Sequence, residues 1–452
     1  MKKANARLLA IDILCQRQET GQPVDQIRDQ VLQQALLPER KDAQLVMALV
    51  YGVLRRQRYL DAILQNFSSH PLPKMKNLTL QALRVGLLQL CCMDRIPPSA
   101  AINETVNALK ESRQPRWLTG FVNGLLRAIA RQADTLPDPE DEKNMRPAAV
   151  RLSHPDWFYA RWCSRYGEAE ATRICLVNNR QPPLVLRVNT RLTAREEFIG
   201  RLATAGIRAQ AGRFCPESVV LPEHRGEIAG IPGYAEGHFM VQDEGAQLIS
   251  LMMAPLPVGA CLDACAGLGG KTAHLAGLAP AGCRIIAVEP NGPRCKLLAE
   301  NVRRLGLASI VTIHQTTLAD LGATGTAPFQ AILVDAPCSG LGVIRRHPDI
   351  RWNRSPADLL RYPREQLALL TQAAGLLAPG GVLVYATCSI EPEENELLVA
   401  DFLETQTGFT LSSPPFFPPE ARQFINEKGF FHTRPDETLD GFFAARLMKS
   451  EE

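Results

Sequence analysis

The segment "LDACAGLGGKTAHL", residues 262–275, decides the fold of the C-terminal half of this 452-residue chain. A short apolar strand leads into a glycine turn, and a helical segment follows the turn. Gly267, Gly269 and Gly270 would let the backbone approach a ligand closely at the N-terminus of that helix. The order of strand, glycine turn and helix therefore predicts a nucleotide-binding α/β domain.

Three kinds of glycine loop could explain this segment. A P-loop requires G-x-x-x-x-G-K-[ST], but its first glycine would fall at Cys265. A dinucleotide fingerprint requires a third glycine at position 272, which is Thr272. The loop of S-adenosylmethionine enzymes remains, and Glu289 supports it, since a carboxylate about 20 residues past the turn can bind ribose hydroxyls. A tight turn that binds nothing is the alternative.

Residues 258–452 alternate between short apolar strands and helical segments. The strand candidates "RIIAVE", "IVTIHQ", "QAILVDAP" and "GVLVYATC" are almost entirely apolar. This pattern predicts a parallel sheet that helices cover on both faces. "TGFTL" and "DGFFAARLMK" are predicted to close the sheet, which gives residues 236–452 a Rossmann-like fold.

Two cysteines follow neighbouring strands of this predicted sheet. Cys338 comes shortly after Asp335 at the end of one strand, and Cys388 ends the next. Ligands of open α/β sheets bind at the carboxyl ends of the strands. A single buried cysteine is usually inert, whereas two at matching strand ends beside an acid indicate a reactive site.

A cysteine and a methyl donor together suit the methylation of cytosine at carbon 5. Addition of a thiolate to carbon 6 makes carbon 5 nucleophilic enough to accept a methyl group. Loss of the carbon 5 proton and elimination of the cysteine then restore the ring. The pair of cysteines and the glycine loop favour this reaction.

Residues 1–131 are predicted to be entirely helical. In "NLTLQALRVGLLQLCC", Leu80, Leu83, Leu87 and Leu90 form one stripe of a helix. Residues 132–150 are polar and proline-bearing and predict a linker, and residues 151–235 predict a small α+β module. Basic residues outnumber acidic ones by 21 to 15 in residues 1–150 and by 12 to 8 in residues 151–235, against 17 to 24 in residues 236–452. The basic front half indicates nucleic-acid binding, although ordinary solvated helix faces would look similar.

Several motifs resemble one family. "DAPCSGLGVIRRHPDIRW", "YATCS", "PEEN" and "DGFF" are similar to those of the bacterial 16S ribosomal RNA cytosine-C5 methyltransferases of the Fmu/Sun (RsmB) group. "YGVLRRQRYLDAIL", "RIPPSAAINETVNALK" and "GFVNGLLR" resemble the NusB-like RNA-binding domain of that group. The resemblance implies a NusB-like all-helical domain (1–131), a linker (132–150), an RRM-like α+β module (151–235) and a class I methyltransferase domain (236–452).

The resemblance also assigns roles to residues. It implies Cys388 as the nucleophile, Cys338 as the group that assists product release, and Asp335 as a neighbour of both cofactor and base. The remaining cofactor residues would be Cys265, Ala266, Gly267, Leu268, Gly269, Gly270, Lys271, Glu289 and Thr316. Lys271 would also point toward the base, unless it is a solvated lysine at a helix start. Arg345 and Arg346 would contact RNA phosphates, unless their loop is merely solvated.

Two positions depart from the family pattern. Gly267-Leu268 stands where the family usually has Ala-Pro, and Thr316 stands where it has an aspartate near the adenine. The glycine turn survives the first change. The second replaces a charged acceptor by a neutral hydroxyl, which puts the affinity for the adenine end in question.

The implied partners are S-adenosylmethionine and 16S ribosomal RNA of the small-subunit precursor, with cytosine 967 as the target. We expect a cytoplasmic protein, because its cysteines show no disulfide spacing. We expect no metal, because the sequence has no C-x-x-C pair or zinc-type Cys/His cluster. We also expect a monomer. We expect no membrane segment, since no apolar run reaches about 18 residues. The alternatives are the same chemistry on another ribosomal cytosine or on transfer RNA, and an RNA-binding protein with an inactive transferase domain.

Overall fold

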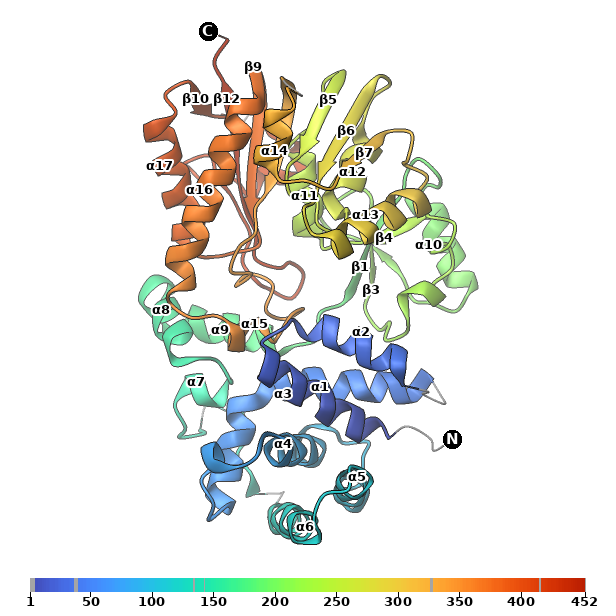
Figure 1. The fold of residues 1–452 in the computed structure, drawn as a ribbon, viewed down its shortest axis with the longest axis vertical. Helices are drawn as coiled ribbons and strands as arrows, with labels where there is room; N and C mark the ends of the chain where they lie inside the picture. Colours follow the sequence, from blue (N-terminus) through green and yellow to red (C-terminus); the bar gives the residue numbers. More distant parts are fainter. Residues whose placement is uncertain are drawn as a thin grey trace. The chain divides into compact units, whose positions relative to one another are not determined.

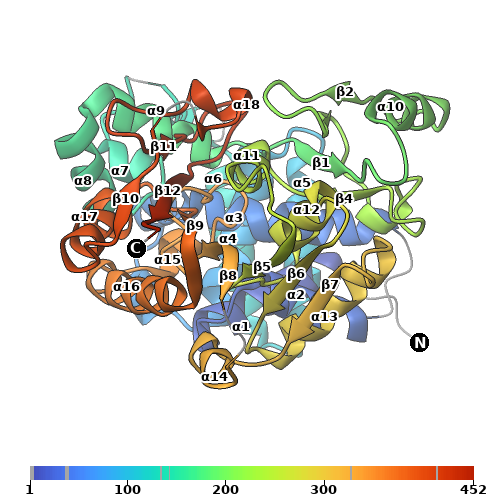
Figure 2. The ribbon, with the colours of Figure 1, turned by 90° about the horizontal axis from the view of Figure 1, so that it is seen from above.

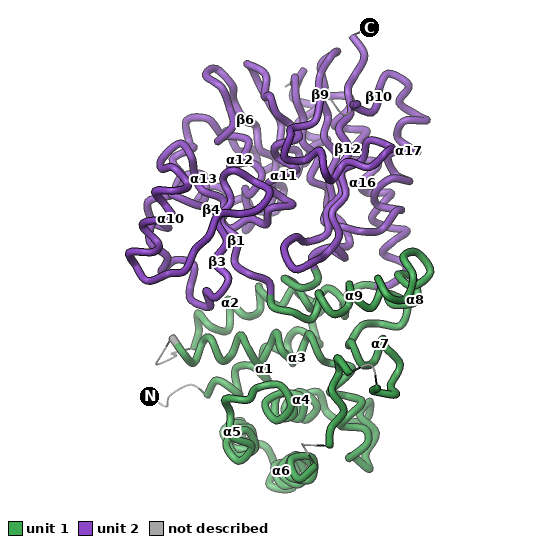
Figure 3. The backbone as a smooth tube through the Cα atoms, turned by 180° about the vertical axis from the view of Figure 1, so that it is seen from behind, with its two compact units in different colours: residues 1–181, 344–354 green, residues 182–343, 355–452 purple. Residues whose placement is uncertain are grey.

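The computed structural model describes residues 5–35, 40–132, 135–141, 143–325, 328–413 and 416–451. The chain forms two compact units (Figure 3). Unit 1 comprises residues 1–181 and 344–354, and unit 2 comprises residues 182–343 and 355–452. The predicted domain boundaries at 131, 150 and 235 remain predictions.

Unit 1 consists of helices in the residues described, as the sequence predicted for its front half (Figure 1). The predicted leucine helix is α4, where Leu80, Leu83 and Leu87 are buried and Leu90 packs against the same core. The helices are α1 (Ala6–Thr20), α2 (Val24–Gln34), α3 (Arg40–Phe67), η1 (Leu72–Lys74), α4 (Asn77–Cys92), α5 (Pro98–Glu111), α6 (Arg116–Ala130), α7 (Ala148–Arg151), α8 (Asp156–Tyr166), α9 (Glu168–Asn179) and α15 (Ile350–Asn353).

The late segment 344–354 is an integral part of unit 1. Arg351 is completely buried and donates hydrogen bonds to the carbonyls of Ser153 (3.1 Å) and Asn178 (2.9 Å). The indole of Trp352 donates to the carbonyl of Leu54 at 2.8 Å. Because a buried guanidinium needs such partners, these bonds hold the segment firmly against the helices of unit 1.

Unit 2 begins with a small antiparallel sheet of order β2-β3-β1-β4. Its strands are β1 (Leu184–Val188), β2 (Gln210–Ala211), β3 (Ser218–Leu221) and β4 (Phe239–Val241), and helix α10 (Arg195–Thr204) covers one face. Leu186 and Val188 pack there against Phe198 and Leu202. Since β4 pairs with β1, the sheet of this small module continues past residue 235.

The large sheet of unit 2 has the order β10-β12-β9-β8-β5-β6-β7, and β11 pairs with β12. The five strands from β9 to β7 in this order are parallel, whereas β12 runs antiparallel to β9 and β10. This arrangement confirms the predicted Rossmann-like fold with closing strands. The strands are β5 (Gly259–Asp263), β6 (Cys283–Val288), β7 (Val311–His314), β8 (Phe329–Asp335), β9 (Leu377–Thr387), β10 (Phe409–Leu411), β11 (Phe431–His432) and β12 (Phe443–Lys449).

Helices lie on both faces of the large sheet, with α11 and α12 on one side and α14 and α16 on the other (Figure 2). Leu321 and Leu370 pack on Ile332 and Val334 of the central strand β8. Asp243 caps α11 by accepting a bond from the Gly245 amide at 2.8 Å. The helices of unit 2 besides α10 are η3 (Ile228–Gly230), α11 (Glu244–Leu251), α12 (Gly270–Leu278), α13 (Gly292–Arg304), α14 (Leu318–Ala323), α16 (Asp358–Leu376), η4 (Pro392–Glu394), α17 (Glu396–Thr405) and α18 (Pro419–Arg422).

Candidate active site

The structure brings Cys338 and Cys388 together at the carboxyl ends of two neighbouring strands. The parallel register of β8 and β9 places Asp335 beside Ala386, and each cysteine follows within three residues. The two sulfur atoms are 3.2 Å apart. The amide of Gly342 also donates to the carbonyl of Cys388 at 2.9 Å, which fixes the two loops to each other.

The two thiols have opposite acidities. The hydrogen bond from the Cys338 thiol lowers the pKa of Cys388; burial and the charge of Asp335 oppose this, and the charge of Lys271 adds to it. That same bond, burial and the charge on Cys388 raise the pKa of Cys338 well above its usual range. These opposite directions favour ionisation of Cys388 before Cys338.

A buried ion pair borders the thiols. The ammonium of Lys271 lies 2.7 Å from Oδ2 of Asp335, and the Lys271 side chain is only 11% exposed. Burial lowers the pKa of Lys271, but the charge and hydrogen bond of Asp335 outweigh burial and raise it overall. The ammonium also lies over the ring of Phe442, 5.8 Å from its centroid. Lys271 is therefore positively charged in this site.

The glycine loop joins β5 to α12 and requires glycine at two positions. Gly267 has φ = 56° and Gly269 has φ = 87°, both in the left-handed region that glycine tolerates best. A Cβ atom on Gly269 would lie 2.5 Å from Cδ1 of Leu298, whereas one on Gly267 would meet no atom within 4 Å. The amide of Ala266 donates to the carbonyl of Val288 at 2.9 Å, which ties the loop to β6.

Two further predicted residues follow the next strands of the sheet. Glu289 comes directly after β6, is 5% exposed, and accepts a hydrogen bond from the Asn291 amide at 2.8 Å. Thr316 lies two residues after β7 and is half-buried. The glycine loop, Glu289 and Thr316 thus lie at the carboxyl ends of three adjacent strands, the usual ligand-binding edge of such a sheet.

Sequence reasoning missed Asp263, the last residue of β5. It is 1% exposed and accepts a hydrogen bond from the hydroxyl of Thr272 at 2.7 Å. Burial raises the pKa of Asp263 to about 6; the Thr272 bond opposes this and the nearby charge of Asp335 adds to it. Its position at the end of a strand, just before the glycine turn, was the sequence feature that could have indicated a place in the site.

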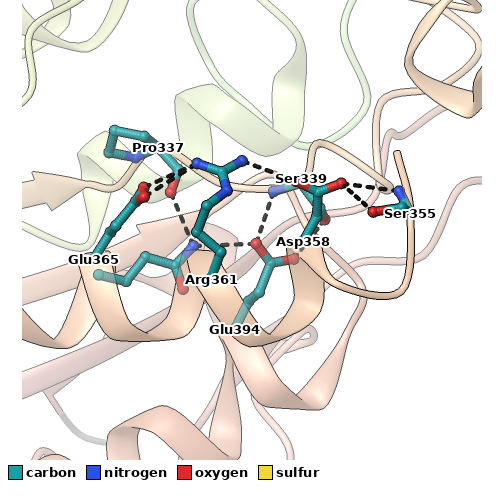
Figure 4. Close-up of polar contacts among 8 residues, drawn as sticks. Pro337, Ser339, Ser355, Asp358, Arg361, Glu365 and Glu394 are labelled. Atoms are coloured by element: carbon teal, nitrogen blue, oxygen red, sulfur yellow. Dashed lines mark hydrogen bonds and ion pairs between the residues drawn. The ribbon is translucent and has the colours of Figure 1, made fainter. Parts of the chain in front are cut away.

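Sequence reasoning also gave no role to Glu394, which joins the two cysteine loops. Figure 4 shows its contact with Ser339 of the first loop. Its Oε1 accepts bonds from the Ser339 amide (2.7 Å) and from Nε2 of Gln366 (3.1 Å). Its Oε2 accepts bonds from the hydroxyls of both Ser339 and Ser389. Each serine directly follows one cysteine, so Glu394 holds both loops. The paired Cys-Ser dipeptides and the motif "PEEN" were the sequence features that could have indicated this role.

Arg345 and Arg346 belong to unit 1. Arg345 is 2% exposed, and its carbonyl accepts a bond from Arg55 at 3.1 Å. Arg346 is half-buried, and the neighbouring His347 is exposed. Their contact with RNA phosphates stays a prediction.

Among the described residues, no group of three or more His, Cys, Asp or Glu side chains is arranged to hold a metal ion. In the same residues, no helix combines the length and the apolar character that a membrane crossing requires. All twelve cysteines, each of which lies in a described range, are free thiols.

The fold is that of a class I methyltransferase with an appended NusB-like helical domain, and family comparisons match this architecture. The family model of 16S rRNA methyltransferase RsmB/F matches residues 250–448. The NusB family matches residues 4–131, and a ferredoxin-like domain of RsmF/B-like methyltransferases matches residues 154–226.

Curated relatives match nearly the whole chain. The Bacillus subtilis protein named "Probable ribosomal RNA small subunit methyltransferase B" is 33% identical, covering 99% of this chain and 100% of the relative. The Salmonella paratyphi B protein named "Ribosomal RNA small subunit methyltransferase B" is 34% identical, with 99% of each chain covered. This chain belongs to the ribosomal RNA small subunit methyltransferase B family, and the resemblance predicted from its motifs is confirmed.

Solved structures share the fold. The crystal structure of PH0851 superimposes with a TM-score of 0.79 at 24% identity, covering 99% of this chain and 100% of that one. NSun6 from Pyrococcus horikoshii, solved with SFG, has a TM-score of 0.59 at 22% identity, with 66% of this chain and 99% of that chain covered. At these identities the likeness concerns the fold alone.

Proposed function

We propose that this protein transfers a methyl group from S-adenosylmethionine to carbon 5 of a cytosine in 16S ribosomal RNA. Cytosine 967 is the target that the family resemblance implies, and a covalent bond between Cys388 and carbon 6 is the intermediate. One observation carries the proposal: the sulfur atoms of Cys388 and Cys338 lie within hydrogen-bond distance, 3.2 Å apart, at the ligand-binding edge of the sheet.

Cys388 performs the addition step. Because its pKa is lowered, mainly by the Cys338 bond, Cys388 has a larger thiolate fraction than an unperturbed cysteine at the same pH. The sulfur forms a bond to carbon 6, and the electron pair of the 5,6 double bond moves to make carbon 5 nucleophilic. The Lys271 ammonium, which helps to stabilise the thiolate, also favours negative charge that develops on the ring.

Cys338 acts in the release step. After carbon 5 is methylated, its proton leaves, the 5,6 double bond re-forms, and the bond between carbon 6 and the Cys388 sulfur breaks. The Cys338 sulfur, 3.2 Å from that leaving sulfur, can again donate a hydrogen bond to the thiolate that departs. A thiol with a raised pKa suits this role because it remains protonated while Cys388 carries the charge.

The residues present fit S-adenosylmethionine. The loop from Cys265 to Lys271 leaves open space at Gly267, where a Cβ atom would otherwise project. The buried carboxylate of Glu289 can accept bonds from ribose hydroxyls. Thr316 offers a neutral hydroxyl to the adenine end, and Asp335 borders the methionine end. When bound, the cofactor supplies an electrophilic sulfonium methyl group.

The RNA partner follows from the front of the chain. Residues 4–131 match the NusB family, and residues 1–150 have a basic excess of 21 to 15. We assign the binding of the small-subunit RNA precursor to unit 1, with Arg346 as a phosphate contact and a monomer as the active form. Arg345 is only 2% exposed and offers phosphate little surface.

The test has two stages. Calorimetry of the full-length protein should show one binding site for S-adenosylmethionine. Small-subunit RNA incubated with the protein and S-adenosylmethionine should gain a methyl group. Bisulfite mapping of ribosomal RNA from cells that lack the protein should show loss of one 5-methylcytosine. Methylation of transfer RNA instead would show that transfer RNA, and not 16S ribosomal RNA, is the substrate. RNA binding without cofactor binding would show that the transferase domain is inactive.

A further inference from the structure

Helix α12 carries the end of the glycine loop and Lys271 in its first turn, and a residue from the small module holds this turn. Arg187, on strand β1, donates a hydrogen bond to the carbonyl of Gly270 at 2.7 Å. The same nitrogen donates to the side-chain oxygen of Gln242, just ahead of α11. Arg187 is 5% exposed, so these bonds lie out of contact with bulk water.

A second residue of the module reaches the next turn of α12. Oε2 of Glu217, the residue before β3, lies 3.1 Å from Nε2 of His274. Burial and the charge of Arg187 lower the pKa of His274 to about 4, so His274 is neutral at pH 7. Burial lowers the pKa of Arg187 to about 10, which the charge of Glu217 opposes. The opposite charges of Arg187 and Glu217 therefore stabilise each other beside the start of the helix.

The strand pattern explains why Arg187 faces α12. Its neighbours Leu186 and Val188 point to the opposite face of the small sheet and pack there against α10. The register pairs Arg187 with Ser218, which directly follows Glu217. The small sheet thus uses one face for its own core and the other to contact the helix of the glycine loop.

We infer that Arg187 is a positioning residue for cofactor binding. By fixing the peptide group between Gly270 and Lys271, it sets the orientation of the glycine loop at the start of α12. The small module is then a structural support of the cofactor site, in addition to any contact that it makes with RNA. This inference rests on the proposed function of the loop 265–271.

Replacement of Arg187 by Met should weaken S-adenosylmethionine binding. The change removes both charged hydrogen bonds and the positive charge that acts on Glu217. Loss of one such bond corresponds to a dissociation constant about 10- to 100-fold higher. RNA affinity should stay within about twofold, because Arg187 is buried beneath the helix and has no exposed cationic surface for phosphate.

The test is calorimetry of the full-length protein with S-adenosylmethionine, together with the KM values for cofactor and RNA. Arg208→Met is the matched control, because Arg208 lies in the same module but is 71% exposed and pairs with the exposed Glu223. Arg187→Lys should recover part of the affinity, since it restores a charged donor. A purely structural role would lower the melting temperature without separating the two KM values.

The outcomes are distinguishable. Weak cofactor binding by folded Arg187→Met, partial recovery by Arg187→Lys and normal binding by Arg208→Met support the inference. Wild-type affinity in folded Arg187→Met overturns it and leaves the proposed function intact. If Arg187→Met does not fold, a folded Arg187→Lys variant with wild-type affinity overturns the inference. A wild-type protein that binds no S-adenosylmethionine overturns the proposed function itself.

Discussion

Lys271 and Asp335 form an ion pair, 2.7 Å from nitrogen to oxygen, and act in opposite directions on Cys388. The ammonium lowers the pKa of this thiol, and the carboxylate raises it. The two charges oppose each other, and the hydrogen bond with Cys338 is the largest influence on the pKa of Cys388. Substitution of either residue should therefore test how its charge affects the pKa of Cys388.

Removal of either partner should shift the ionisation of Cys388 in a known direction. Lys271→Met removes the stabilising charge, so the pKa of Cys388 should rise; Asp335→Asn removes the opposing charge, so it should fall. The pH dependence of iodoacetamide alkylation, read by mass spectrometry on the peptide that contains Cys388, measures both shifts. Shifts of the same sign in both variants would contradict the assigned electrostatics.

Replacement of the two cysteines should give equally inactive proteins with opposite trapping behaviour. Cys388→Ala should form no covalent RNA adduct, because the sulfur that attacks carbon 6 is gone. Cys338→Ala should form the adduct and fail to release it, so a protein–RNA species stable in denaturing gels should accumulate. Trapping by Cys388→Ala instead would reverse the two roles.

Glu289→Ala should weaken S-adenosylmethionine binding by about 1.5–3 kcal/mol, the value of a hydrogen bond to a charged group. Glu289→Gln is the matched control: it keeps an oxygen that can accept the Asn291 amide and a ribose hydroxyl, and should lose less. Calorimetry measures both variants. Unchanged affinity in Glu289→Ala would remove this carboxylate from the cofactor site.

Glu394→Ala should slow methyl transfer even though Glu394 does not contact either sulfur. The change leaves Ser339, Ser389 and Gln366 without their shared acceptor, so the two cysteine loops lose their common anchor. We expect a lower kcat and a lower melting temperature, with S-adenosylmethionine affinity retained. A variant with wild-type kcat would show that the loops hold their spacing without this carboxylate.

Acid should destabilise the protein through His274. Its folded pKa of about 4 lies below the unfolded value of about 6.5, so the unfolded state binds more protons between these values and stability falls as pH falls. The loss from this group is about 2 kcal/mol between pH 7 and pH 5. The pKa of Asp263 is raised to about 6, so the folded state binds more protons than the unfolded state at this residue as the pH falls. Protonation of Asp263 therefore stabilises the protein over an overlapping pH range and offsets part of this loss.

The contribution of His274 can be isolated. His274→Gln removes the titrating group, so its stability should fall less between pH 7 and pH 5 than that of the wild type. Denaturant unfolding at the two pH values measures the difference. Equal losses in the two proteins would show that another group governs the acid response.

The parts of the fold predicted from sequence are those set by local pattern. The apolar strands that end at Asp335 and Thr387, and the glycine turn at Gly267 and Gly269, each carry their signal within a few residues. Parallel strands place their carboxyl ends along one edge, so the convergence of the two cysteines followed from topology alone.

The parts that escaped prediction depend on packing between distant segments. Glu394 gathers partners from positions 339, 366 and 389, and no local pattern shows that these meet. The three-residue strand β4 was assigned with the large domain, because a strand this short does not reveal which sheet it joins. Arg187 looked like an ordinary polar position in a strand, since its burial depends on α12.

The segment 344–354 makes unit 1 discontinuous along the chain, with a consequence for folding during synthesis. The ribosome makes a chain from its N-terminus, and early domains can fold while later ones are still being made. Unit 1 cannot be completed in this way, because Arg351 and Trp352 emerge only after the glycine loop and Cys338. Until then, the carbonyls of Ser153, Asn178 and Leu54 lack these donors. The helical unit therefore reaches its final form only after strands β5 to β8, half of the large sheet, have been made.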